Sequence, residues 1–96
     1  MPHHNLDAIK LAFSNGSGLV TRAATQAAAE LGCGLDEITA IIQTIGNGHF
    51  YKSMTSNYNA SVWQDVYHVP HAGRTLYVKF TDNGGTEFTL LSFKEK

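Results

Sequence analysis

The spacing of apolar residues changes near Phe50, and this change constrains the fold more than any other feature of the chain. Before it, apolar side chains recur every three or four residues, which is the period of an α-helix. After it, they alternate with polar side chains, which is the period of a strand with one buried face. Residues 50–94 also hold nine of the ten aromatic residues, which favour strands. The sequence therefore predicts helices first and a sheet second.

Three helices are expected in the first half. Asn5, Thr21 and Asp36 are residue types that cap helix N-termini, and each comes just before or within an apolar periodic run. Gly32 suits a left-handed stop after the second helix. The residues expected to face the core are Leu6, Ile9, Leu11 and Phe13 in the first helix, and Leu35, Ile38, Ile41, Ile42 and Ile45 in the third.

Three strands are expected in the second half, with a further short strand or turn entry at 50–54. Segment 61–69 alternates throughout, and 75–81 would bury Leu76, Val78 and Phe80 while exposing Tyr77, Lys79 and Thr81. Residues 70–73 and 82–85 are predicted turns, the second a hairpin, and 87–94 is the last strand. The predicted fold class is α+β, with N-terminal helices packed on a small antiparallel sheet in one domain, 1–96.

Composition excludes several kinds of protein. The net charge of −1 is not that of a strongly basic nucleic-acid binder, so any anion-binding patch must be local. Cys33 is the only cysteine, which excludes an intrachain disulfide and a thiolate metal site. His68 and His71 have no acidic or thiol partner at ligand spacing, so neither a metal nor another cofactor is expected.

No membrane association is expected either. The N-terminus lacks the basic start and long apolar run of a signal peptide, and no stretch approaches the ~18 apolar residues of a membrane span. A soluble, cytoplasmic protein is expected.

Side chains suited to RNA gather in the second half. Lys52 and Lys94 are cations for phosphate, Gln64 is an amide that donates and accepts, and Tyr77 offers a hydroxyl and a ring. RNA is cut without a metal when its 2′-hydroxyl attacks the adjacent phosphorus, given a proton acceptor, a cation and an acid. Lysine and tyrosine fill these roles when their pKa is lowered by neighbouring cations. The plainer readings are a solvated lysine, a structural amide and a charged tail.

Further RNA contacts are expected around these four residues. Stacking surfaces and phosphate contacts would come from Tyr51, His68, His71, Arg74 and Lys79, and Trp63 is a possible stacking ring. The alternative for the histidines and Arg74 is ordinary exposed loop chemistry.

Three strings resemble a known family in order and spacing: Phe-Tyr-Lys-Ser-Met-Thr at 50–55, Val-Trp-Gln-Asp-Val-Tyr at 62–67, and Ser-Phe-Lys-Glu-Lys at 92–96. They resemble the motility quorum-sensing regulator toxins, which are type II toxin–antitoxin ribonucleases with a RelE-like fold. The likeness covers nearly the whole chain and is strongest after Phe50.

The resemblance implies an mRNA interferase that cuts without metal, with a preference for GC-containing sites such as GCU. The family's important residues fall on Lys52, Gln64, Tyr77 and Lys94. It also implies an antitoxin partner with a zinc-binding N-terminal domain and a helix-turn-helix C-terminal domain.

The chain departs from the family pattern where arginines are replaced by His68 and His71. If these histidines take over the phosphate contacts, RNA binding is expected to strengthen as pH falls towards 6. Two alternatives remain: an inactive relative that binds an antitoxin or RNA, and a small structural domain.

Overall fold

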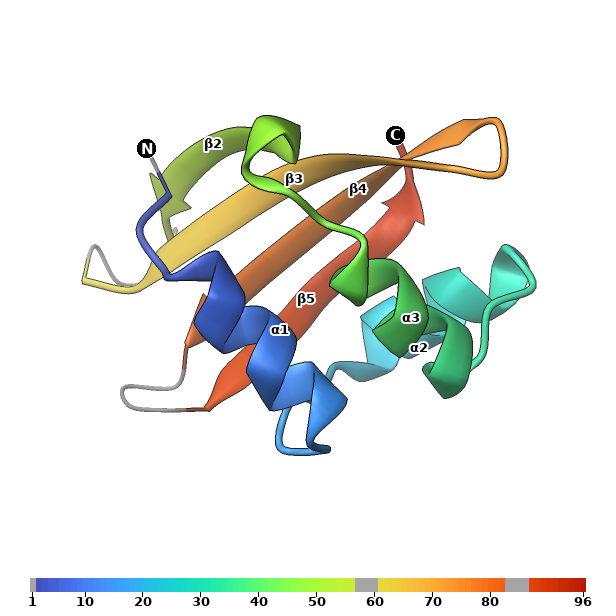
Figure 1. The fold of residues 1–96 in the computed structure, drawn as a ribbon, viewed down its shortest axis with the longest axis horizontal. Helices are drawn as coiled ribbons and strands as arrows, with labels where there is room; N and C mark the ends of the chain where they lie inside the picture. Colours follow the sequence, from blue (N-terminus) through green and yellow to red (C-terminus); the bar gives the residue numbers. More distant parts are fainter. Residues whose placement is uncertain (1, 57–60, 83–86) are drawn as a thin grey trace.

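The computed structural model describes residues 2–56, 61–82 and 87–96. It consists of three α-helices and a five-stranded sheet, and the helices lie against one face of that sheet (Figure 1). The predicted α+β class is therefore confirmed. The hairpin turn predicted at 82–85 lies mostly outside the described residues.

The helices are α1 (Leu6–Ser14), α2 (Arg22–Glu30) and α3 (Leu35–Gln43). Two predicted N-caps are confirmed, since Asn5 accepts the Ala8 N–H at 3.0 Å and Thr21 accepts the Ala24 N–H at 3.1 Å. The third was wrong. The N-cap of α3 is Gly34, whose N–H donates to the Glu37 carboxylate at 2.6 Å. Asp36 lies in the first turn, where its charge favours the helix dipole.

The sheet has the order β1-β5-β4-β3-β2, and only β1 runs parallel to its neighbour. The strands are β1 (Leu19–Val20), β2 (Phe50–Thr55), β3 (Trp63–His71), β4 (Arg74–Asp82) and β5 (Phe88–Glu95). β1 was not predicted because two residues are too few to display an alternation. A single-turn 3₁₀ helix, Asn47–His49, precedes β2.

The turn between β3 and β4 is shorter than predicted. Pro70 and His71 belong to β3 and pair with Thr75 and Arg74, so only Ala72 and Gly73 form the loop. These two residues have φ of 51° and 79°, as a two-residue turn between twisted strands requires.

The core lies between the helices and the sheet. Ile9, Ile38 and Ile42 from the helices meet Tyr67, Val78, Phe80 and Phe93 from the strands, all at most 1% exposed. Leu11 and Leu35 were wrongly expected in this core, because both are 64% exposed. The phase of α1 buries Ala12 instead, and Leu35 lies at the start of α3. No helix among the described residues is long and apolar enough to cross a membrane.

The alternation of β3 separates two sets of side chains. Asp65, Tyr67 and Val69 face the helices, whereas Gln64, Val66 and His68 face the other way. Their register partners on β4 divide in the same manner, with Tyr77 beside His68 and Lys79 beside Val66. Thr81 shares this second face but is only 7% exposed, contrary to expectation, because its hydroxyl donates to the Trp63 carbonyl at 2.8 Å.

Candidate active site

The face of the sheet turned away from the helices, called the open face below, carries most of the polar residues singled out in the sequence. Figure 1 shows that α1, α2 and α3 all lie on the other side of the strands. The side chains of the open face, taken from the strand register, include Lys52 and Met54 on β2; Gln64, Val66 and His68 on β3; Tyr77, Lys79 and Thr81 on β4; and Thr89, Ser92 and Lys94 on β5.

All four predicted catalytic residues lie on this face, one on each of four adjacent strands. Tyr77 pairs with Lys94, whose Nζ lies 5.4 Å from the centre of the Tyr77 ring. Lys52 pairs with Val66, and Gln64 pairs with Thr81. Residues spread over 43 positions of sequence, from Lys52 to Lys94, are therefore collected on one surface. The two lysines are exposed, whereas Gln64 and Tyr77 are half-buried.

Three rings form a row across β2, β3 and β4. Tyr51 stacks on His68 with ring centres 4.1 Å apart and planes 21° apart. His68 lies 6.1 Å from the Tyr77 ring. The Lys52 Nζ lies 5.5 Å from the Tyr51 ring, so each end of the row has a lysine beside it. Aromatic surfaces next to cations suit unpaired bases and their phosphates.

The electrostatics of the open face are dominated by cations. Partial burial, with Lys94 and Lys52 nearby, lowers the pKa of the Lys79 amine below its usual value. The carboxylates on the described parts of β3, β4 and β5 lie on the opposite face of the sheet; they are Asp65, Asp82 and Glu95. A chain of net charge −1 thus keeps a local cationic surface.

His68 lies within the ring row. Burial, and to a smaller extent the charge of Lys96, lower the pKa of His68 below its usual 6.5. The ring is consequently neutral at pH 7, where it serves as a stacking surface. Protonation adds a positive charge to the row only at lower pH.

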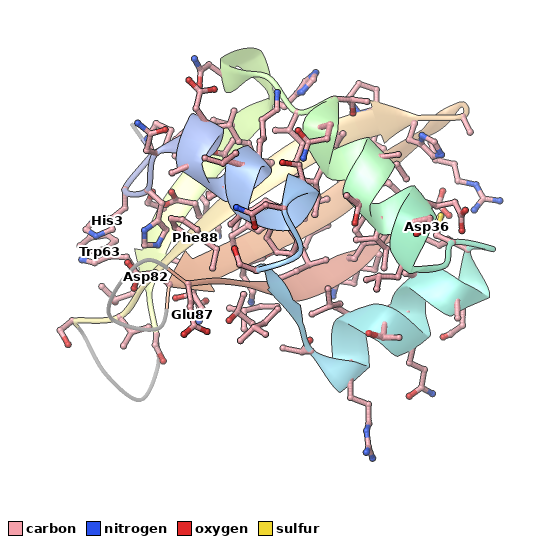
Figure 2. All side chains as sticks on the ribbon, turned by 60° about the horizontal axis from the view of Figure 1, so that its bottom comes forward. His3, Asp36, Trp63, Asp82, Glu87 and Phe88 are labelled. Carbon is pink, nitrogen blue, oxygen red and sulfur yellow. The ribbon has the colours of Figure 1, made fainter. Side chains whose placement is uncertain are left out.

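Two predicted RNA-binding residues are not brought to this face. His71 and Arg74 pair with each other at the tip of the β3–β4 hairpin, in register with the helix side. They line a hollow of about 180 Å³ together with Leu31 and Cys33. Trp63, a possible stacking ring, instead stacks on His3 at the other end of the sheet, with ring centres 5.0 Å apart. Figure 2 shows His3 and Trp63 side by side there.

Sequence reasoning missed Ser92 as a member of the open face. Ser92 is the register partner of Lys79, so its hydroxyl side is directed to the same surface. The irregularity between Lys79 and Phe80 shifts the alternation of β5, and this shift hid Ser92 in the sequence pattern.

The described residues contain no group of three or more His, Cys, Asp or Glu side chains that could hold a metal ion. The polar groups of the open face are amines, an amide, hydroxyls and an imidazole. These groups bind phosphate and transfer protons.

The fold and the open face define a small α+β protein whose cationic, ring-bearing sheet surface is suited to a single-stranded nucleic acid. Residues 1–95 match the family model described as motility quorum-sensing regulator, toxin of MqsA. The chain is also similar to the mRNA interferase toxin MqsR of Escherichia coli strain K12, with 35% identity over 95 residues. That match covers 99% of this chain and 95% of the relative. The chain belongs to the MqsR toxin family.

Proposed function

We propose that this protein is the toxin of a type II toxin–antitoxin system, an endoribonuclease that cleaves mRNA and thereby inhibits translation and growth. The observation that carries the proposal is the gathering of Lys52, Gln64, Tyr77 and Lys94 on the open face. Membership of a toxin family, and similarity to a protein named as an mRNA interferase, support the same activity. The reaction belongs to the cytoplasm, where mRNA is translated.

The proposed reaction needs no metal. Lys52 and Lys94 bind the scissile phosphate and neutralise the charge that develops on its oxygens. Gln64 positions the substrate, since its amide donates and accepts hydrogen bonds. Tyr77 lies beside Lys94 and orients the phosphate or transfers a proton. The products are a 2′,3′-cyclic phosphate and a 5′-hydroxyl.

Two finer features rest on the family resemblance. The preferred sites are GC-containing, such as GCU. The partner is an antitoxin with a zinc-binding N-terminal domain and a helix-turn-helix C-terminal domain. The family description, which names these proteins as toxins of a partner, supports the existence of an antitoxin.

The second candidate is an inactive relative that binds RNA or the antitoxin without cutting. The ring row of Tyr51, His68 and Tyr77 is compatible with this alternative, because stacking rings bind RNA whether or not it is then cut.

The deciding experiment is the cleavage of a defined RNA that contains GCU, GCA and control sites, in excess EDTA. The wild type and Lys52→Ala are compared, with thermal unfolding as a check on folding. Discrete cuts that end in 2′,3′-cyclic phosphate, and that fall at least ~100-fold in the variant, support the proposal. A folded, antitoxin-free wild type that does not cut overturns it in favour of the binding role.

A further inference from the structure

Lys79 lies at the centre of the open face. On one side it pairs with Val66 of β3, which in turn pairs with Lys52 of β2. On the other side it pairs with Ser92 of β5, two residues before Lys94. Residues two apart on one strand share a face about 7 Å apart, so Tyr77 and Thr81 flank Lys79 along β4. The four predicted catalytic residues therefore surround it.

The surroundings of Lys79 differ from those of the other lysines on this face. Its side chain is half-buried, whereas Lys52 and Lys94 are exposed. Val66, the register partner of Lys79, is fully buried although its side chain faces away from the core. The long side chains around Val66 on the open face therefore cover it and exclude water there. An amine in such a place loses hydration when it is charged.

The titratable groups facing Lys79 are two lysines, a histidine and a tyrosine. Lys52 approaches from β2, His68 from β3, Tyr77 from its own strand and Lys94 from β5. No carboxylate of the described strands shares the face with these groups. Cations on two sides and partial burial both favour the neutral amine, and the lowered pKa of Lys79 agrees with this geometry.

We propose that the Lys79 amine is the proton acceptor for the 2′-hydroxyl of the RNA, an inference that rests on the proposed ribonuclease function. Lys52 and Lys94 then serve as the phosphate cations. Their charges have a second effect, because they raise the fraction of Lys79 that is neutral at a given pH. The three lysines of the open face then have different roles, one as the base and two as phosphate cations.

Two protons move in the proposed step. The neutral Lys79 amine takes the proton of the 2′-hydroxyl and becomes an ammonium, while O2′ forms a bond to the adjacent phosphorus. The bond from phosphorus to O5′ breaks, and O5′ takes a proton from the Tyr77 hydroxyl. The Lys79 ammonium then releases its proton to solvent, and the Tyr77 phenolate regains one from water.

The test compares Lys79→Arg with the wild type. Arginine keeps the positive charge and the long side chain, but it cannot act as a base at the pH of the assay. Lys96→Arg, at the exposed C-terminus, is the matched control. Single-turnover cleavage is measured in EDTA from pH 6 to 10, and binding is measured with an uncleavable RNA bearing 2′-deoxyribose at the cut site.

Lys79→Arg should cleave at least ~100-fold more slowly than the wild type, with an RNA dissociation constant within about threefold of the wild-type value. The wild-type rate should rise with pH, and this rise should be lost in the variant. Cleavage within about threefold of the wild type, or loss of RNA binding in parallel with cleavage, overturns the base role. If the wild type itself leaves the RNA uncleaved, the result overturns the proposed ribonuclease function instead of the role of Lys79.

A second readout does not depend on cleavage. The side-chain NMR signals of the lysines are followed from pH 7 to 12, and the Lys79 signal is assigned by its absence from Lys79→Arg. A Lys79 midpoint clearly below 10.5 supports the inference, and a midpoint at or above 10.5 overturns it. If Lys79→Arg fails to fold, Lys79→Gln assigns the Lys79 signal in the same way, by its absence, and the midpoint of that signal then decides.

Discussion

The buried carboxylate of Asp65 accepts the backbone N–H of His4 at 2.7 Å, which fastens the start of the chain to the sheet. The same carboxylate accepts the His3 N–H at 3.1 Å and the Ser53 hydroxyl. The His4 ring adds contacts to the Trp63 carbonyl and to Asp82, and Figure 2 shows the nearby side chains of His3, Trp63 and Asp82 gathered at this end. Asp65 thus organises the end of β3 from the side opposite the open face.

Asp65→Asn should lower the free energy of unfolding by about 3 kcal/mol. An amide cannot accept all of these hydrogen bonds as a carboxylate does, and its N–H group would face other donors in a buried place. Urea denaturation measures the loss. Asp36→Asn is the control, because Asp36 is exposed at the far end of the molecule (Figure 2) and should cost at most about 0.5 kcal/mol. Equal stability of both variants would contradict this role for Asp65.

Gly18→Ala should destabilise the protein by about 1–3 kcal/mol. A Cβ at Gly18 would lie 2.5 Å from the Phe13 ring, which is buried against Phe80, so the ring or the backbone would have to shift. Thermal unfolding reports the effect. At Gly46 a Cβ would meet nothing within 4 Å, so Gly46→Ala should be close to neutral. A Gly18→Ala variant as stable as the wild type would disprove the close packing.

Tyr67 has a buried hydroxyl without a hydrogen-bond partner in the part of the chain that the structure describes. Burial, together with the nearby Asp65 charge, raises the pKa of Tyr67 to about 12. Above pH 10 the unfolded chain loses this proton while the folded protein keeps it until about pH 12. The stability that the raised pKa of Tyr67 contributes is therefore complete below pH 10. As pH rises to 12 this contribution, roughly 3 kcal/mol, is lost.

Tyr67→Phe removes both features. The variant should be as stable as the wild type at pH 7, or more stable by about 1 kcal/mol, since no buried hydroxyl is left unpaired. It should also lose less stability than the wild type between pH 10 and 12. Denaturant titrations at pH 8, 10 and 11 test both statements, and identical pH dependence in the two proteins would refute the second.

Tyr77→Phe should slow mRNA cleavage by at least ~100-fold with little change in thermal stability, because the ring remains beside Lys94 while the hydroxyl is lost. Tyr67→Phe is the matched control. Tyr67 lies on the neighbouring strand but faces the core, so its variant should cleave at the wild-type rate. Equal cleavage rates for both variants would exclude a role for the Tyr77 hydroxyl in the reaction.

RNA affinity should depend on pH through His68 with a midpoint below pH 6.5. The pKa of His68 lies below this value, so the ring is mostly neutral at pH 7 and 8 and gains its positive charge as pH falls further. Dissociation constants for an uncleavable RNA at pH 8, 7, 6 and 5 measure the effect. His68→Phe keeps the stacked ring and should lack the His68 part of the change. A transition of the wild type centred above pH 6.5, absent from the variant, would show that His68 titrates normally.

Much of the fold was determined by local sequence. The caps Asn5 and Thr21, the stop at Gly32 and the alternation of 75–81 follow from single residues and from their period, which act within a few positions of the chain. The same alternation placed Tyr77 and Lys79 on the face opposite Val78 and Phe80. The three strings shared with the family mark Lys52, Gln64 and Lys94 by sequence alone.

Tertiary structure decided what no local period encodes. The pairing of β1 with β5, the N-terminal anchor on Asp65 and the exposure of Leu11 depend on contacts between distant segments. The register of β2 to β5 decided that Lys79 stands between Lys52 and Lys94, and that His71 and Arg74 stand apart at the hairpin tip. A strand's period fixes which residues share a face, but only its hydrogen-bonded register with neighbouring strands fixes which of them meet.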